Sequence, residues 1–122
     1  MKKKIEILGS TVSIGKTLIV IVKKNKDQFE ILLLTSNTNY KELLKQVKIF
    51  KVRNIVINDY KTYAYVKKKL KNKKINIFNK LDNFKNVLNK KKIDYTMSAI
   101  AGFSGLKPTL DIIKFSKTIA IA

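Results

Sequence analysis

The residues best placed to do chemistry are two glycines, Gly9 and Gly15, and the small residues between them. An apolar run stops at Gly9, and a helical pattern opens near Ser13. A strand that breaks at glycine and restarts as a helix leaves backbone N–H groups facing one point, where the helix dipole favours negative charge. This spacing predicts a pyrophosphate site, although Gly9, Val12 and Gly15 match a dinucleotide loop only in part.

The rest of the chain alternates between strand-like apolar runs and segments whose apolar residues recur at helical spacing. Strands are predicted at Lys4–Leu8, Phe29–Thr35, Asn54–Asn58, Ile75–Phe78, Ile93–Ile100 and Thr118–Ala122. Helices are predicted at Ser13–Lys24, Asn39–Lys51, Asp59–Lys71, Leu81–Asn89 and from Pro108 to about Lys117. This order predicts an α/β fold, a Rossmann-like, doubly wound and mainly parallel six-stranded sheet with helices on both faces.

Three loops of small or polar residues are expected at one edge of this sheet. Ligands of doubly wound folds bind beyond the carboxyl ends of the strands, where the strand order reverses. The loops expected there are Gly9–Gly15, Thr35–Asn39 and Ala101–Gly105. Their small side chains would let a ligand approach the backbone closely. Since 122 residues hold one core, the site is predicted on a single domain.

Composition excludes several other kinds of site. The chain has no cysteine and no histidine, so disulfides, thiolate metal sites and imidazole bases are excluded. Its longest apolar run, Leu18–Val22, is far shorter than a membrane span. No signal-peptide pattern is visible at the amino terminus. We therefore expect a cytoplasmic protein with no membrane partner.

The net charge of +19 raises the alternative of a nucleic-acid binder. Every basic residue except Arg53 is a lysine, and asparagine and isoleucine are also abundant. A genome rich in A and T would produce this profile without selection for a ligand. Nucleic-acid readers usually rely on arginine forks and interleaved aromatic side chains. Nucleic acid is therefore the less favoured partner.

Two longer motifs, one near each end of the chain, carry a family resemblance. Ile7–Gly15 is similar to the pattern I-L-G-S-T-G-S-I-G, and Met97–Leu110 to the pattern A-I-V-G-x-x-G-L-x-P-T-L. Ser116–Ala122 is similar to a following G-K-x-I-x-L-A strand, and Asp27–Glu30 stands at the entry to the second strand. In this order they resemble the 1-deoxy-D-xylulose 5-phosphate reductoisomerase family along the whole chain.

The resemblance implies an NADPH-binding domain from an enzyme of non-mevalonate isoprenoid biosynthesis. That family rearranges 1-deoxy-D-xylulose 5-phosphate and reduces it with NADPH to 2-C-methyl-D-erythritol 4-phosphate. Its divalent metal (magnesium, manganese or cobalt) and its substrate are held by a separate central domain, which has no counterpart in residues 1–122. The implied protein is thus an NADP-dependent oxidoreductase by family, truncated and inactive alone. Full-length members are implied to be homodimers through the missing region.

The residues implied to bind NADPH are Gly9, Thr11, Val12, Ser13, Ile14, Gly15, Asn37, Thr38, Asn39, Ala99 and Ile100. None is implied to be catalytic or to bind a metal. Val12 replaces the family's middle glycine, so we expect strain at a positive φ and two methyl groups facing the phosphate, costing about 1–3 kcal/mol. Thr38 replaces a lysine near the adenosine 2′-phosphate, where Lys41 or Lys45 could supply charge, and no carboxylate ends the second strand. The alternative is a stand-alone or vestigial nucleotide-binding module with a degraded loop.

Overall fold

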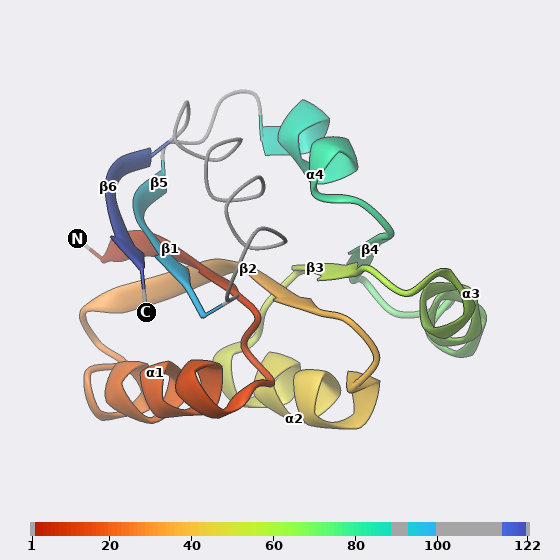
Figure 1. The fold of residues 1–122 in the computed structure, drawn as a ribbon, viewed down its shortest axis with the longest axis horizontal. Helices are drawn as coiled ribbons and strands as arrows, with labels where there is room; N and C mark the ends of the chain where they lie inside the picture. The colour runs from red at the N-terminus through yellow and green to blue at the C-terminus, as the bar shows by residue number, and fades with distance from the viewer. Residues whose placement is uncertain (1, 89–92, 100–115, 122) are drawn as a thin grey trace.

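The computed structural model describes residues 2–88, 93–99 and 116–121, which form one sheet with helices packed on it (Figure 1). The strands are β1 (Lys3–Leu8), β2 (Phe29–Ser36), β3 (Asn54–Ile57), β4 (Asn76–Phe78), β5 (Ile93–Ser98) and β6 (Ser116–Ile121). The helices in the described part are α1 (Ser13–Lys24), α2 (Tyr40–Phe50), α3 (Tyr60–Lys69) and α4 (Leu81–Leu88). None of these helices is long and apolar enough to cross a bilayer.

The sheet has the strand order β4-β3-β2-β1-β5-β6, and its five pairings are all parallel. The chain moves outward from β1 through β2 and β3 to β4, then returns to the other side of β1 as β5. The strand order therefore reverses between β1 and β5, where residues 5–8 pair with residues 95–98. This confirms the predicted Rossmann-like, parallel, six-stranded fold and places its switch point at the carboxyl ends of β1 and β5.

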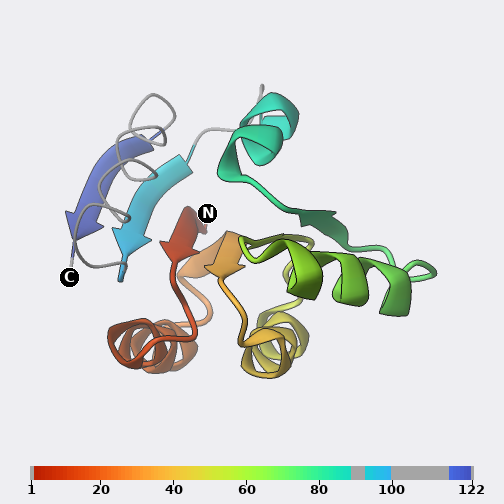
Figure 2. The same ribbon diagram turned by 45° about the vertical axis from the view of Figure 1, so that its right-hand side comes forward.

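Helices cover both faces of the sheet (Figure 2). One face packs against α1, α2 and α3, whose buried residues Ile19, Leu43 and Val66 join a core cluster with Ile5 and Ile7 of β1. On the other face, Phe84 of α4 joins a second cluster that includes Leu8, Leu32, Val56 and Ile93. Because successive side chains of a strand alternate between its faces, Glu6 of β1 lies on the α4 side, like Leu8.

The structure corrects two element ends near the carboxyl terminus. The helix expected from Pro108 to about Lys117 is wrong at its end, because Ser116 and Lys117 belong to β6. Parallel pairing with β5 sets the start of β6, and local periodicity carries no information on such long-range pairing. Strand β5 ends at Ser98, short of the expected Ile100. The expected loop Ala101–Gly105 and residues Asn89 and Ile100 lie outside the described residues.

Candidate functional site

The turn between β1 and α1 is built on Gly9. The φ angle of Gly9 is 75°, a left-handed conformation that a side chain would strain. The Gly9 N–H donates to Thr35 Oγ1 (2.9 Å), and the Ser10 N–H donates to the Thr35 carbonyl oxygen (3.0 Å). Thr35 is the penultimate residue of β2. These two hydrogen bonds fix the turn against the carboxyl end of the neighbouring strand.

Gly15 allows the first turn of α1 to lie directly on this turn. A Cβ added at Gly15 would collide with the carbonyl oxygen of Gly9 and lie 2.8 Å from backbone atoms of Ser10. Real Cβ atoms do not approach backbone so closely, so only glycine fits without a shift of the helix. This is the helix–strand packing role of the last glycine in a dinucleotide loop. The amino end of α1 is thereby held beside the end of β1.

The amino end of α1 has no side-chain cap. Its N-cap residue is Val12, which offers no acceptor, whereas the side chains of Asn39 and Asp59 cap α2 and α3. The first N–H groups of α1, those of residues 13–15, have no acceptor within the helix. They lie at the amino end of α1, at the positive end of the helix dipole and beside the carboxyl end of β1. This is the donor arrangement that the sequence predicted for a pyrophosphate.

The structure corrects the expected backbone strain at Val12. Its φ is −79° and its ψ is 168°, which is ordinary extended backbone. An N-cap residue takes this extended conformation, and a β-branched residue adopts it readily. The positive φ falls on Gly9 instead. The side chain of Val12 is 47% exposed, so its isopropyl group lies at the surface of the turn and does not fill its interior.

The loop after β2 is joined to the same turn. Thr11 Oγ1 and Ser36 Oγ share a buried hydrogen bond of 2.8 Å. Asn37 and Thr38 follow with exposed side chains, and the Asn39 side chain accepts from the first turn of α2. Two of the three predicted loops therefore lie side by side at the carboxyl edge of the sheet.

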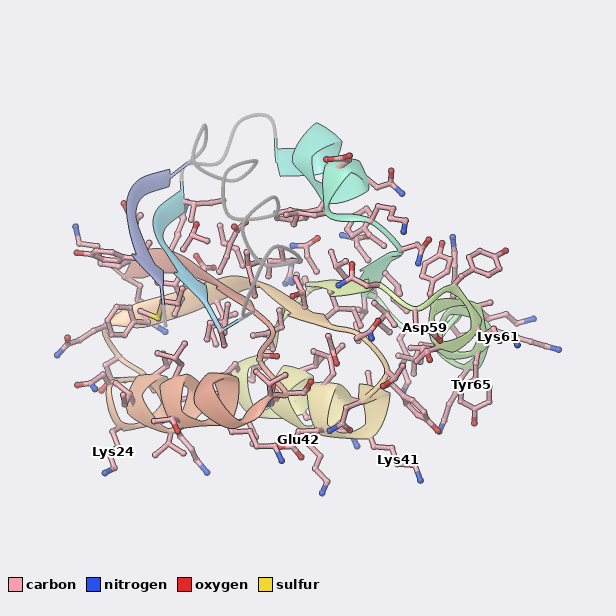
Figure 3. All side chains as sticks on the ribbon, in the orientation of Figure 1. Lys24, Lys41, Glu42, Asp59, Lys61 and Tyr65 are labelled. Carbon is pink, nitrogen blue, oxygen red and sulfur yellow. The ribbon has the colours of Figure 1, made fainter. Side chains whose placement is uncertain are left out.

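A carboxylate that the sequence did not associate with this loop also lies here. The Asp59 N–H, at the end of the next strand along the sheet, donates to the Asn37 carbonyl oxygen (3.3 Å). The Asp59 carboxylate accepts from the Thr62 hydroxyl (2.7 Å) and the Thr62 N–H (3.0 Å), and these two hydrogen bonds lower its pKa. Figure 3 shows Asp59 at the start of α3 and Lys41 projecting from α2 away from the sheet. No carboxylate ends β2 itself, but Asp59, which follows β3, is bonded to its loop through its backbone N–H.

The structure also describes Ala99, one of the two NADPH contacts implied at the end of β5. The Ala99 N–H donates to the Leu8 carbonyl oxygen (2.8 Å), and its side chain is buried. The exit from β5 is therefore bonded to the exit from β1, directly at the switch point. The remaining predicted contact, Ile100, lies outside the described residues.

One buried polar residue behind the turn, Gln46, was missed by the sequence prediction. Gln46 Nε2 of α2 donates to the Ser10 carbonyl oxygen (2.9 Å), and both residues are buried. Gln46 lies on the buried face of its helix together with Leu43 and Val47. A glutamine among the apolar positions of an amphipathic helix was the available signal, because a buried amide needs a hydrogen-bond partner.

A depression of about 500 Å³ lies at the opposite edge of the sheet. Its lining includes Phe29 and Asn54, the first residues of β2 and β3, and Lys26, Lys51 and Arg53, which precede these strands. The amino ends of the strands are far from the turn at Gly9. This depression is therefore separate from the candidate site.

Comparisons with known proteins agree with this arrangement. A model of the 1-deoxy-D-xylulose 5-phosphate reductoisomerase family matches residues 5–122. The reductoisomerase of Pelagibacter ubique is 55% identical over 121 residues, which cover 98% of this chain and 31% of that protein. The reductoisomerase of Buchnera aphidicola (strain Tuc7) is 38% identical over 122 residues and is likewise covered to 31%.

A solved structure gives the same match in three dimensions. The Zymomonas mobilis reductoisomerase in complex with NADPH aligns with a TM-score of 0.86 at 31% identity, covering 100% of this chain and 32% of that chain. The chain thus spans about a third of the length of the relatives it matches. The parallel sheet, the turn at Gly9 and Gly15, and these end-to-end matches show that the chain belongs to the 1-deoxy-D-xylulose 5-phosphate reductoisomerase family.

Proposed function

We propose that this chain is the NADPH-binding domain of a reductoisomerase and holds the pyrophosphate of the cofactor at the amino end of α1. The observation that carries the proposal is the uncapped amino end of that helix, seated on the turn by Gly9 and Gly15. The Zymomonas relative, solved with NADPH, supports the choice of cofactor. NADPH would supply a hydride, and the residues described here would bind and orient it.

Backbone groups carry most of the proposed binding. The N–H groups of residues 13–15 would face the pyrophosphate. The exposed Asn37 and Thr38, which follow β2, would lie nearest the adenosine ribose, where dinucleotide folds read that sugar. Ala99 stands at the switch point, and Ile100 follows it in the chain. The predicted contacts would therefore be spread along the length of one extended NADPH molecule.

We further propose that the chain does not turn over substrate by itself. It contains no histidine or cysteine. In the part of the chain that the structure describes, no three His, Cys, Asp or Glu residues come together as a metal site would require. These observations support a division in which acid–base and metal chemistry belong to other parts of the enzyme. The dimeric state and the cytoplasmic location stay predictions.

Isothermal titration calorimetry with NADPH tests the proposed function. We expect micromolar binding. Absence of binding at millimolar NADPH would indicate a vestigial module instead. An NADPH-oxidation assay should show no rate that depends on 1-deoxy-D-xylulose 5-phosphate, and such a rate would contradict the second proposal.

Replacing Val12 with glycine should change the Kd for NADPH by no more than about threefold, because the extended backbone of Val12 stores no strain to release. The same change should lower the free energy of unfolding by about 0.5–1 kcal/mol, since glycine gives the unfolded chain more freedom. Calorimetry and urea denaturation measure the two effects. Val12→Ala is the control, because it removes the methyl groups without adding as much backbone freedom. Binding at least tenfold tighter in both variants would show that the isopropyl group obstructs the phosphate.

A further inference from the structure

Gln46 connects helix α2 to the turn that follows β1. Its Nε2 atom donates to the Ser10 carbonyl oxygen at 2.9 Å, between residues 36 apart in the chain. Gln46 is 2% exposed and Ser10 is 0% exposed, so water does not compete for this hydrogen bond. A carbonyl oxygen only accepts hydrogen bonds, so the amide NH₂ of Gln46 must be the group that faces it.

This hydrogen bond sets the orientation of the peptide between Ser10 and Thr11. The C=O and N–H of a trans peptide point in opposite directions, and no cis peptide occurs in the described residues. Because the Ser10 carbonyl points to Gln46, the Thr11 N–H points in the opposite direction, away from α2.

The peptide between Gly9 and Ser10 cannot present an N–H donor to a ligand, because its carbonyl and its N–H are both hydrogen-bonded within the protein. The Gly9 carbonyl oxygen accepts from the Val12 N–H (3.3 Å), and the Ser10 N–H donates to the Thr35 carbonyl oxygen (3.0 Å). The peptide that Gln46 holds is therefore the one that can present a donor from the turn to a ligand.

Packing alone does not explain a glutamine at this position. Its Oε1 atom is buried without a hydrogen-bond partner in the described structure, as is Ser10 Oγ. A buried polar atom left unpaired destabilises the fold, and the adjacent buried position on α2 is Val47, an apolar residue. The unpaired Oε1 atom of Gln46 therefore destabilises the fold, whereas its Nε2 atom makes the hydrogen bond that holds the turn.

We propose that Gln46 is a positioning residue of the NADPH site, which aims the Thr11 N–H at the pyrophosphate beside the N–H groups of residues 13–15. This inference rests on the proposed function. Gln46 does not touch the cofactor. It acts through the Ser10 carbonyl, from a helix whose own amino end is already capped by Asn39.

The test compares three variants of the 122-residue chain by calorimetry with NADPH. Gln46→Met keeps the length of the side chain and removes the donor, so the Kd should rise about 5- to 10-fold. Gln46→Glu keeps the shape, and where its buried carboxyl group is ionised it places a charged oxygen against the Ser10 carbonyl oxygen, so its Kd should rise with increasing pH, unlike that of Gln46→Met. Val47→Ala is the matched control, since it opens a cavity in the same helix turn and leaves the Ser10 contact intact. Its Kd should stay within about twofold of the wild-type value.

A second measurement needs no ligand. Amide hydrogen exchange of Thr11, followed by NMR, should change in Gln46→Met and not in Val47→Ala when the variants are compared at equal global stability. If wild-type protein binds NADPH and Gln46→Met binds it equally tightly, the inference is overturned and the proposed function stands. If Gln46→Met and Val47→Ala weaken binding to the same extent, Gln46 is only a packing residue, which also overturns it. Failure of the wild-type chain to bind NADPH removes the proposed function itself.

Discussion

Replacing Gly15 with alanine should lower the free energy of unfolding by roughly 3 kcal/mol, as expected for overpacking against atoms that cannot move aside. The added methyl group would collide with the Gly9 carbonyl oxygen and press on the backbone of Ser10. Both residues are held to β2 by hydrogen bonds from their N–H groups to Thr35, so relief requires α1 to move off the sheet. Urea denaturation followed by circular dichroism measures the loss.

Val20→Ala is the control for this change, because it places the same residue on the same helix at a side chain that is 52% exposed. Alanine has the higher helix propensity, so the control should match or slightly exceed wild-type stability. Gly15→Ala should also weaken NADPH binding, since a displaced α1 carries its first N–H groups away from the turn. Stability within about 0.5 kcal/mol of wild type would show that the contact between helix and turn is not tight.

The parts of this fold that the sequence predicted well depend on local patterns. Alternating apolar runs and helical stripes located the described strands and helices, and the helix predicted to begin at Asp59 begins at Tyr60, with Asp59 as its N-cap. The glycines at 9 and 15 located the turn because each has a local steric reason, a positive φ at one and a helix contact at the other. The same reasoning misjudged Val12, since which residue of the turn takes the positive φ depends on how the turn is tied to β2.

The features that the sequence did not predict depend on contacts between distant segments. Asp59 reaches the Asn37 loop only because β3 lies next to β2. Gln46 meets Ser10 because α2 packs beneath the turn. Lys117 falls in β6 because that strand pairs with β5. Each of these follows from sheet order and register, which periodicity does not encode.

Glu6 should make the folded chain less stable as the pH rises from about 4.5 to about 8. It is fully buried in β1, between Leu33 of β2 and Thr96 of β5, and neither carboxyl oxygen has a hydrogen-bond partner in the described structure. Burial removes the ionised form from water and raises the pKa of Glu6 from 4.5 to about 8. The carboxyl group is therefore neutral in the folded protein at pH 7.

The direction of this pH dependence follows from the number of protons that the folded and unfolded states bind. Between these two pKa values the folded state keeps the proton and the unfolded state has lost it, so each rise in pH favours unfolding. The slope is at most about 1.4 kcal/mol per pH unit. Lys4 and Asp94 lie on the same side of β1 and β5, and the Asp94 carboxylate accepts from the Lys4 backbone N–H (2.8 Å). Other titrating groups are present in both wild type and a Glu6 variant. The difference between their free energies of unfolding at each pH therefore removes most of what those groups contribute to the pH dependence.

Glu6→Leu should be more stable than wild type at pH 7, by about 2 kcal/mol or more, because it buries no group that must first gain a proton. Urea denaturation at pH 5, 6, 7 and 8 should show the advantage of the variant growing with pH. Glu6→Gln should also lose the pH dependence while keeping a buried polar group. Glu30→Gln, at an exposed carboxylate on β2, should change little at any pH. A difference between wild type and Glu6→Leu that is constant across this range would mean that Glu6 is ionised in the folded protein, which requires a cationic or hydrogen-bonding partner for a fully buried carboxylate.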